Sequence, residues 1–178
     1  QHVYYVLNLG GLATWVYDLS LRTWMRWNTG EHGHWKPFLG VTVGGDVLAF
    51  DHESTTIWKM SPEAWDDAGE PFSSEFMAKA EIKSGAADCS NLQLTCRTGR
   101  GPRGGYGSDP AIQMRYSDDE GEKWSRWRER PLGATGESRK RVRWNALGQI
   151  EAPWGRIFHF RCNAPVGRRF SDLTMNVD

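Results

Sequence analysis

The chain of 178 residues has a formal net charge of zero at pH 7 and holds 10 tryptophans and 20 glycines. Its length permits one good-sized domain or two small ones with a buried core, and its aromatic and glycine content favours short strands and frequent turns over a helical bundle. No apolar run approaches the roughly 18 residues that a membrane-spanning helix needs, so we expect a soluble protein with no membrane partner.

The charges are distributed unevenly along the chain. Residues 1–99 hold 7 basic and 12 acidic side chains, whereas residues 100–178 hold 15 basic and 10 acidic ones. The acidic half of one copy could contact the basic half of another copy, head to tail. Alternatively, the charges could be scattered by chance over two solvent-exposed surfaces.

Residues 1–60 contain short apolar segments separated by turn residues. In the first predicted hairpin an aromatic strand ends at Asp18, a short polar loop follows, and Trp24 comes soon after. This order is typical of a β-propeller blade, in which the aspartate anchors the turn and the tryptophan fills the space between blades. We therefore predict propeller-blade strands over residues 1–60.

The polar stretch 61–71 predicts a linker, and the remainder of the chain predicts a second all-β domain. Apolar residues alternate with polar ones at Leu92, Leu94 and Cys96, as expected for a strand with one buried and one solvent-exposed face. The sequence thus predicts an antiparallel β-sandwich-like domain over residues 72–178, with little helix anywhere in the chain.

The stretch 114–127 predicts a hairpin between two aromatic-rich strands. Ser117, Asp119, Gly121 and Trp124 have the S-x-D-x-G-x-x-W spacing of the Asp-box hairpins of sialidase-like propellers. Gly121 can adopt a positive φ, Asp118 or Asp119 can bond the turn backbone, and aromatic residues can pair across the strands. The W-x-R-W pattern at 124–127 also occurs at 24–27, which suggests two similar hairpins.

Three arginines alternate in the predicted strand 139–144. Arg139, Arg141 and Arg143 would point to one side, and Lys140, Val142 and Trp144 to the other. Such an arginine face could line a channel, bind phosphates or pair with acids of a neighbouring chain. A plain exposed face with local salt bridges is the alternative.

The sequence offers no convincing catalytic, metal or cofactor site. His32 and His34 have no evident third ligand, no serine or cysteine lies in a nucleophile elbow, and the acids fall in turns. The three cysteines, Cys89, Cys96 and Cys162, cannot all pair within the chain, and free buried thiols in a reducing compartment are favoured over a Cys89–Cys96 bridge.

Taken in order, the motifs resemble the C-terminal part of the packaged-DNA stabilisation, or tail hub, proteins of short-tailed bacteriophages. The resemblance is carried by Tyr5-Val6-Leu7, Thr14 to Leu19 with Trp24, Asp67-Ala68-Gly69-Glu70-Pro71, Met114 to Trp124, Arg141-Val142-Arg143-Trp144, and the segments Phe158 to Val166 and Leu173 to Val177. The likeness covers most of the chain. It departs at Glu120, where that family often has a second glycine, and at the N-terminus, where family members are substantially longer; the chain is either a short protein or a fragment.

The resemblance implies a virion structural protein without turnover. Such a protein assembles in the host cytoplasm as a ring-like homo-oligomer, joins the connector to distal tail proteins, and helps to retain packaged DNA, with which it could make non-specific contacts. The alternatives are a sialidase-like Asp-box glycosidase and a carbohydrate- or nucleic-acid-binding β module. The first would need further blades and an arginine cluster facing a tyrosine and a carboxylate.

Overall fold

A computed structural model describes residues 2–30, 32–51, 54–61, 63–67, 70–101, 103–105 and 107–177 of the chain. These residues form fifteen strands, all paired antiparallel, and contain no helix. The all-β fold predicted from the sequence is confirmed. Ala68 and Gly69 of the predicted Asp-x-Gly-x-Pro turn lie outside the described residues, as does Glu31 beside the two histidines.

The chain divides into two compact units, residues 1–72 and 73–178. The first unit contains two three-stranded antiparallel sheets and one pair of very short strands. Its strands are β1 (Tyr4–Asn8), β2 (Thr14–Asp18), β3 (Thr23–Trp27), β4 (Leu39–Val43), β5 (Asp46–Phe50), β6 (Ile57–Met60), β7 (Asp66–Asp67) and β8 (Glu70–Pro71). The short strands β7 and β8 fall within the stretch that we predicted as a linker.

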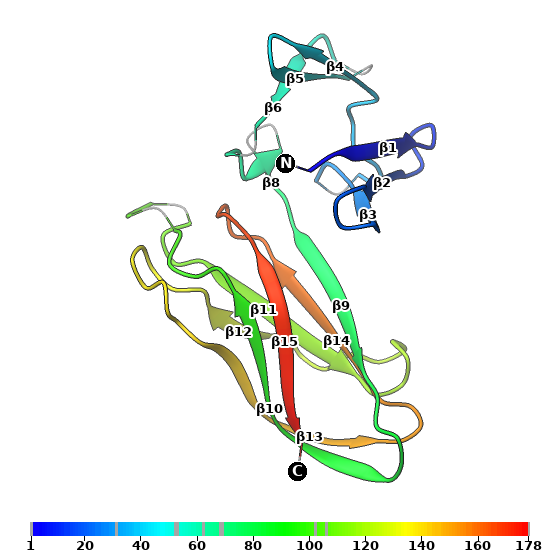
Figure 1. The fold of residues 1–178 in the computed structure, drawn as a ribbon, viewed down its shortest axis with the longest axis vertical. Helices are drawn as coiled ribbons and strands as arrows, with labels where there is room; N and C mark the ends of the chain where they lie inside the picture. The colour runs from blue at the N-terminus through cyan, green and yellow to red at the C-terminus, as the bar shows by residue number, and fades with distance from the viewer. Residues whose placement is uncertain are drawn as a thin grey trace. The chain divides into compact units, whose positions relative to one another are not determined.

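Each three-stranded sheet of the first unit is a meander of neighbouring strands, β1-β2-β3 and β4-β5-β6 (Figure 1). The turn after β2 is held by Asp18, whose Oδ1 accepts hydrogen bonds from the backbone N–H groups of Ser20 (2.8 Å) and Leu21 (3.1 Å). Asp18 thus has the turn-anchoring role that the sequence predicted. Trp24 packs against Tyr17 at 5.1 Å between ring centroids, and the assignment of these meanders to propeller blades stays a prediction.

The first unit leaves most of its large apolar side chains exposed. Of the 21 exposed large hydrophobic residues described in the chain, 18 lie in this unit, including Leu12 at 81% and Trp15 at 38% exposure. Its buried apolar side chains are few, with Val16 and Ala49 the examples below 2% exposure. Exposed apolar surface on this scale is typical of a region that contacts other protein surfaces.

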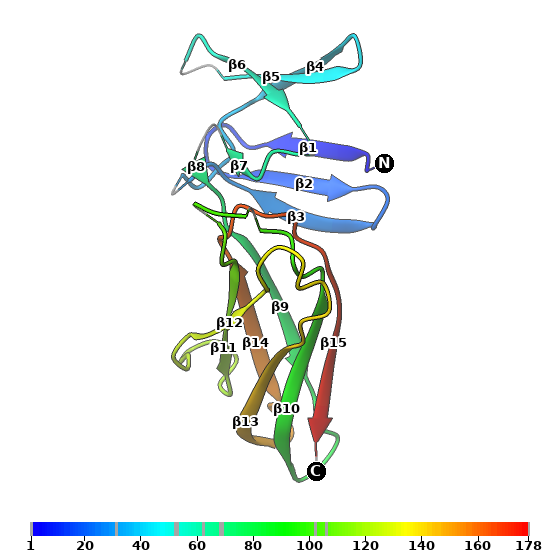
Figure 2. The same cartoon turned by 90° about the vertical axis from the view of Figure 1, so that its left-hand side faces the viewer.

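The second unit consists of two antiparallel sheets, ordered β13-β10-β15 and β12-β11-β14-β9 (Figures 1 and 2). Its strands are β9 (Ser74–Ala80), β10 (Ala86–Cys96), β11 (Ala111–Ser117), β12 (Arg128–Pro131), β13 (Val142–Glu151), β14 (Arg156–Cys162) and β15 (Phe170–Val177). The two sheets face each other across one hydrophobic core, which makes this unit a β-sandwich.

Alternating side chains of both sheets supply that core. Leu92 and Trp144 enter it from the first sheet, and Ile112, Phe158 and Phe160 enter it from the second, all with exposures of 1% or less. Trp144 satisfies its indole N–H by donating to the backbone carbonyl of Arg128 at 3.0 Å. Full burial of one such large side chain contributes roughly 1.5–3 kcal/mol.

Two predicted strands differ from the structure. Residues 118–127 form a loop, so Trp124 and Trp127 do not lie in a strand that pairs with β11, and the second strand of the hairpin begins only at Arg128. The other W-x-R-W segment is the strand β3. The two copies of the pattern are therefore not similar hairpins, and that interpretation was wrong.

The predicted arginine strand 139–144 is also wrong in its first half. Arg139 and Arg141 lie in the loop before β13, which begins at Val142. Arg143 lies within β13, where its Nη2 donates to Oε1 of Gln93 in β10 at 2.6 Å. The three arginines therefore do not share one strand face.

Candidate functional site

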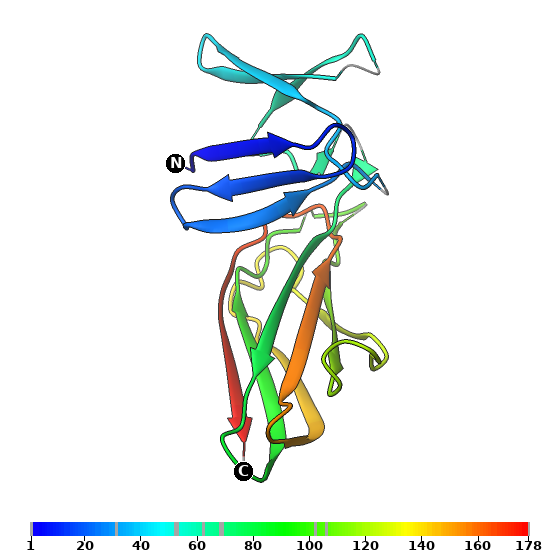
Figure 3. The same cartoon turned by 90° about the vertical axis from the view of Figure 1, so that its right-hand side faces the viewer.

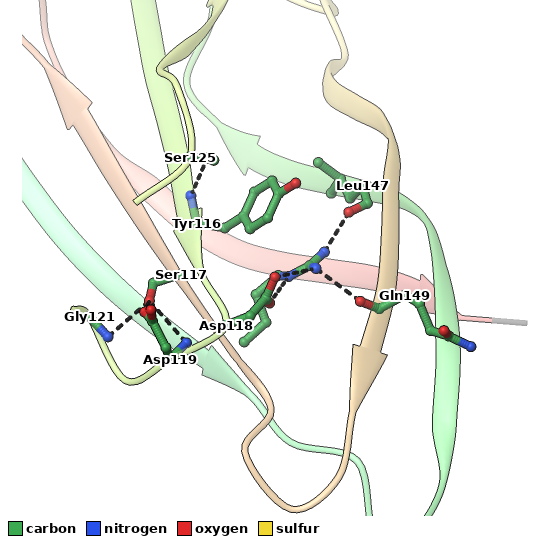
Figure 4. A network of polar contacts seen from close by, with 9 residues as sticks. Tyr116, Ser117, Asp118, Asp119, Gly121, Ser125, Leu147 and Gln149 are labelled. Atoms are coloured by element: carbon green, nitrogen blue, oxygen red, sulfur yellow. Dashed lines mark hydrogen bonds and ion pairs between the residues drawn. The ribbon is translucent and has the colours of Figure 1, made fainter. Parts of the chain in front are cut away.

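The turn after β11 is built by the hydroxyl of Ser117 and the carboxylate of Asp119. The Ser117 Oγ donates to Oδ1 of Asp119 at 2.7 Å and accepts from the backbone N–H of Gly121 at 2.9 Å (Figure 4). The same carboxylate oxygen accepts from the backbone N–H of Lys123 at 2.8 Å. Three of the four residues of the predicted Asp-box spacing thus meet in one turn.

These hydrogen bonds stabilise the charged form of Asp119. The backbone N–H of Lys123 and the hydroxyl of Ser117 hold the pKa of Asp119 below its ordinary value, and the positive charge of Lys123 acts in the same direction. Both polar side chains are therefore engaged in fixing the turn. The arrangement gives Asp119 the chemistry of a turn anchor, because a general acid would need a raised pKa.

Arg156, the first residue of β14, connects this hairpin to the opposite sheet. Its Nε and Nη2 donate to the two carboxylate oxygens of Asp118 at 2.5 and 2.9 Å. Its Nη1 donates to the carbonyl of Leu147 at 2.6 Å and its Nη2 to that of Gln149 at 3.0 Å, both in β13 (Figure 4). The guanidinium also lies 4.1 Å from the ring centroid of Tyr116.

Sequence reasoning missed Arg156, although the sequence carries a signal for it. Arg156 has the same strand parity as Phe158, Phe160 and Cys162, which face the core, and its side chain is 3% exposed. An arginine at an inward-facing position of an apolar strand requires a buried acceptor set. We call Arg156, Asp118 and the two β13 carbonyls the arginine clamp.

The tryptophans of the loop pack on arginines of the sheet β12-β11-β14-β9. The guanidinium of Arg115 lies 4.5 Å from the ring centroids of both Trp124 and Trp127, and that of Arg161 lies 4.4 Å from Trp127. Beneath them, His159 contacts both indole rings. Cation–π contacts of this kind hold the loop against the sheet, which explains why Trp124 follows the turn.

His159 is buried by these rings and has a polar partner at each ring nitrogen. Its Nδ1 accepts from Nε of Arg115 at 3.1 Å, and its Nε2 lies 2.8 Å from Oε2 of Glu75 in β9. With Nδ1 as the acceptor, the Nε2–H tautomer donates to Glu75. The interactions of His159 therefore join three strands of one sheet.

The described residues contain no cluster of three or more histidine, cysteine, aspartate or glutamate side chains that could hold a metal ion. Within the same residues, no helix is long and apolar enough to cross a membrane. The three cysteines are free thiols, and burial raises the pKa of Cys96 to about 11. A thiol with so high a pKa is a poor nucleophile at neutral pH.

A model of the protein family described as bacteriophage P22 Gp10, beta-sandwich, matches residues 64–178 of the chain. No curated protein matches the chain. The matched residues include all of the described β-sandwich, with the hairpin, the arginine clamp and the tryptophan–arginine contacts. The chain therefore belongs to the bacteriophage P22 Gp10 beta-sandwich family.

Proposed function

We propose that the protein is a non-enzymatic structural protein of a phage virion, placed at the head-to-tail junction or tail hub. The family match over residues 64–178 is the observation that carries this proposal. The candidate site supports it, because Ser117, Asp119 and Arg156 use their polar atoms to fix the hairpin and the two sheets. A rigid sandwich of this kind suits a structural component.

The protein acts through contacts with further copies of itself in a ring and with other tail and connector proteins. The exposed apolar side chains of the first unit support this part of the proposal. They include Tyr4, Tyr5, Trp15 and Trp24, and tyrosine and tryptophan are enriched among the residues that dominate the binding energy of protein interfaces. The ring forms in the host cytoplasm and is then incorporated into the virion.

Retention of packaged DNA is the finer role that we propose for this protein. Arg139 and Arg141 are exposed in the loop before β13 and are available to phosphates or to a neighbouring chain. Arg143 is half-buried and hydrogen-bonded to Gln93, so replacing it would also disturb the contact between β10 and β13. A double Arg139→Ala, Arg141→Ala variant is therefore a cleaner probe of this role than a triple variant.

Quantitative mass spectrometry of purified virions tests the structural role. We expect the protein in every particle at a fixed, ring-like copy number, and the double arginine variant to reduce the DNA content of particles. Absence of the protein from virions would refute the proposal. Particles with unchanged yield and DNA content in the variant would refute only the role in DNA retention.

A further inference from the structure

Three loops of the second unit meet at one end of the β-sandwich. They are residues 97–110 between β10 and β11, 132–141 between β12 and β13, and 163–169 between β14 and β15. The antiparallel register requires this, because the end of β10 pairs with the starts of β13 and β15, and the start of β11 pairs with the end of β12. Arg168 of the third loop also donates to Oγ of Ser74 at the start of β9.

These loops concentrate positive charge. They hold eight basic side chains and two acidic ones, whereas the loops at the opposite end, residues 81–85, 118–127 and 152–155, hold three basic and five acidic ones. The remainder of the second unit, outside the three basic loops, carries ten basic and eleven acidic residues. The net positive charge of this unit therefore comes from the three basic loops.

Most of these cations have no acidic partner among the residues that the structure describes. Lys140 pairs with Glu137 at 3.2 Å, and Arg168 is half-buried and donates to the carbonyl of Ala164. The other six are exposed, and none of them forms an ion pair among the described residues. We call these six the basic end: Arg97, Arg100, Arg103, Arg139, Arg141 and Arg169.

Hydrogen bonds between the loops fix the backbone that presents the basic end. The N–H of Arg97 donates to the carbonyl of Arg169 at 2.9 Å, which places two of its members side by side. Gly99 donates to the carbonyl of Leu132 at 3.1 Å and accepts from Gly136 at 3.3 Å. A backbone that is ordered before binding lowers the entropic cost of binding a ligand.

The approach of these loops is close enough to require glycine at residue 99. Gly99 has a φ of +70°, and a Cβ at this position would lie 2.7 Å from the backbone carbonyl carbon of Glu137. Beside this contact, an open depression of about 340 Å³ is lined by Gly136, Glu137, Ser138, Arg139 and Lys140. Of the basic end, Arg139 therefore lies at the rim of a concave part of the surface.

We propose that the basic end binds the phosphate backbone of double-stranded DNA without reading its sequence. Arginine matches phosphate geometry with paired donors, and contacts to phosphate fix position without sequence information. Tyr106 is the one aromatic residue in the sequence of the three loops, whereas each loop supplies at least one exposed arginine, so contacts with the phosphates of a duplex are favoured over base stacking with a single strand. The inference rests on the proposed function, which brings the protein into contact with packaged DNA.

The other anionic candidate is the first unit of a second copy, which carries nine acidic and four basic residues. Several of its acids are already engaged within the unit. Asp18 bonds His2 at 2.6 Å, and Asp46 pairs with Lys59 at 2.7 Å. DNA phosphates have no such internal partners, which favours DNA as the ligand.

Fluorescence anisotropy with the full chain and a short labelled duplex of random sequence tests the inference. If all six arginines contact phosphates, the logarithm of the binding constant falls with the logarithm of salt concentration with a slope of about −5. The variant R100Q/R141Q/R169Q takes one arginine from each loop. We expect at least a roughly 10-fold loss of affinity at about 50 mM salt and a slope smaller by about 3.

The matched control is K83Q/K123Q/R126Q, which removes three exposed cations from the opposite end of the sandwich. We expect it to bind DNA as the unchanged protein does, with both variants showing the same circular dichroism spectrum. Equal losses in the two variants, no binding by the unchanged protein, or tighter binding of a single strand would each overturn the inference. Self-association that only R100Q/R141Q/R169Q abolishes, without DNA binding, would assign the basic end to a second copy instead.

Virion mass spectrometry of the same variants separates this inference from the proposed function. A particle that incorporates R100Q/R141Q/R169Q at the normal copy number leaves the structural role intact, whatever the DNA-binding result.

Discussion

At the residue scale, Glu120 is the strained position of the hairpin, with a φ of 58° in the left-handed region. A side chain there costs about 1 kcal/mol relative to glycine, and the exposed contact of Glu120 with Lys79 at 3.9 Å contributes little in return. We predict that Glu120→Gly raises the free energy of unfolding by roughly 0.5–1 kcal/mol, measured by chemical denaturation. The control Glu122→Gly, two residues along the same loop, should lower it; a loss of stability in both variants would contradict the argument.

Asp119 makes the hairpin sensitive to acid. Its pKa in the folded protein is held down first by the Lys123 backbone N–H and then by the Ser117 hydroxyl, so its contribution to stability is fully present above the unfolded pKa of about 4. That contribution is lost as the pH falls through the lower folded pKa.

We therefore predict that between about pH 5 and pH 3 the unchanged protein loses more stability than an Asp119→Asn variant does. The measurement is the free energy of unfolding at each pH, with Glu122→Gln as the control for general charge effects. The same slope for Asp119→Asn and the unchanged protein would show that Asp119 is not the group responsible. Glu137, whose pKa is lowered by Lys140 and the Ala134 N–H, titrates alike in all three proteins.

The role of single residues in turns was the most predictable part of the candidate site. Aspartate and glycine act on the backbone within a few residues of themselves, so the turn roles of Asp18 and Gly121 could be assigned from sequence alone, and that of the hairpin aspartate could be narrowed to Asp118 or Asp119. Arg156 could not, because its acceptors come from Asp118 and from β13. Contacts between residues far apart in the chain depend on the packing of the sheets.

At the element scale, the arginine clamp joins β14, the hairpin and β13. We predict that Arg156→Met costs about 3 kcal/mol of stability, because it leaves the carbonyls of Leu147 and Gln149 without their donor and Asp118 without its cation. Asp118→Asn should cost about 1 kcal/mol, since that carboxylate is half-exposed.

Equilibrium denaturation in urea measures the loss of stability in both variants of the arginine clamp. The exposed arginine of the same loop provides the control variant, Arg126→Met, for which we expect a change within about 0.5 kcal/mol. A cost for Arg156→Met no larger than that of the control would show that the clamp does not stabilise the sandwich.

The strands that could be predicted are those with uninterrupted alternation. The sequence predicts strands over residues 23–27 and 156–162, which match β3 and β14. It also predicts strands over 3–7, 13–19 and 47–50, whose bounds agree with those of β1, β2 and β5 within a residue. The strand predicted over residues 139–144 ends too early, because the buried positions of β13 change parity after Val142 and Trp144, at Leu147. Ala146 has a φ of 52°, and the pairing of β10 with β13 shifts register here, so a bulge conceals the alternation.

Residues 124–127, which lie in the loop before β12, are predicted as a strand for the opposite reason. Trp124 and Trp127 have the composition of a strand, yet their partners are guanidinium groups of the neighbouring strands β11 and β14. Strand propensity reflects packing on a half-buried sheet surface, and the same packing is available to a loop that folds over that surface. Composition alone does not distinguish the two arrangements.

At the scale of the whole molecule, each unit carries a different kind of surface. The first unit exposes apolar side chains and has an excess of five acidic residues, whereas the second buries a continuous core and has an excess of five basic ones. The sequence predicted the all-β class and the charge imbalance. It could not predict which apolar residues stay exposed, because exposure depends on whether a second sheet packs against the strand that carries them.

The first and last strands of the sandwich run in the same direction. Both β9 and β15 start at the end that holds the basic loops and finish at the opposite end (Figure 3). Tension applied between Ser73 and Val177 would therefore load the backbone hydrogen bonds of these strands in shear, all at once. Tension between Ser73 and Asn163 would instead open the pairing of β9 with β14 one bond at a time, because Ser74 pairs with Cys162.

We predict a higher unfolding force for the first geometry than for the second in single-molecule pulling experiments. Attachment cysteines introduced at these sites would react selectively, since burial raises the pKa of all three native thiols. Equal forces in the two geometries would contradict the prediction. A sandwich that resists lengthwise tension would suit a structural protein of a virion.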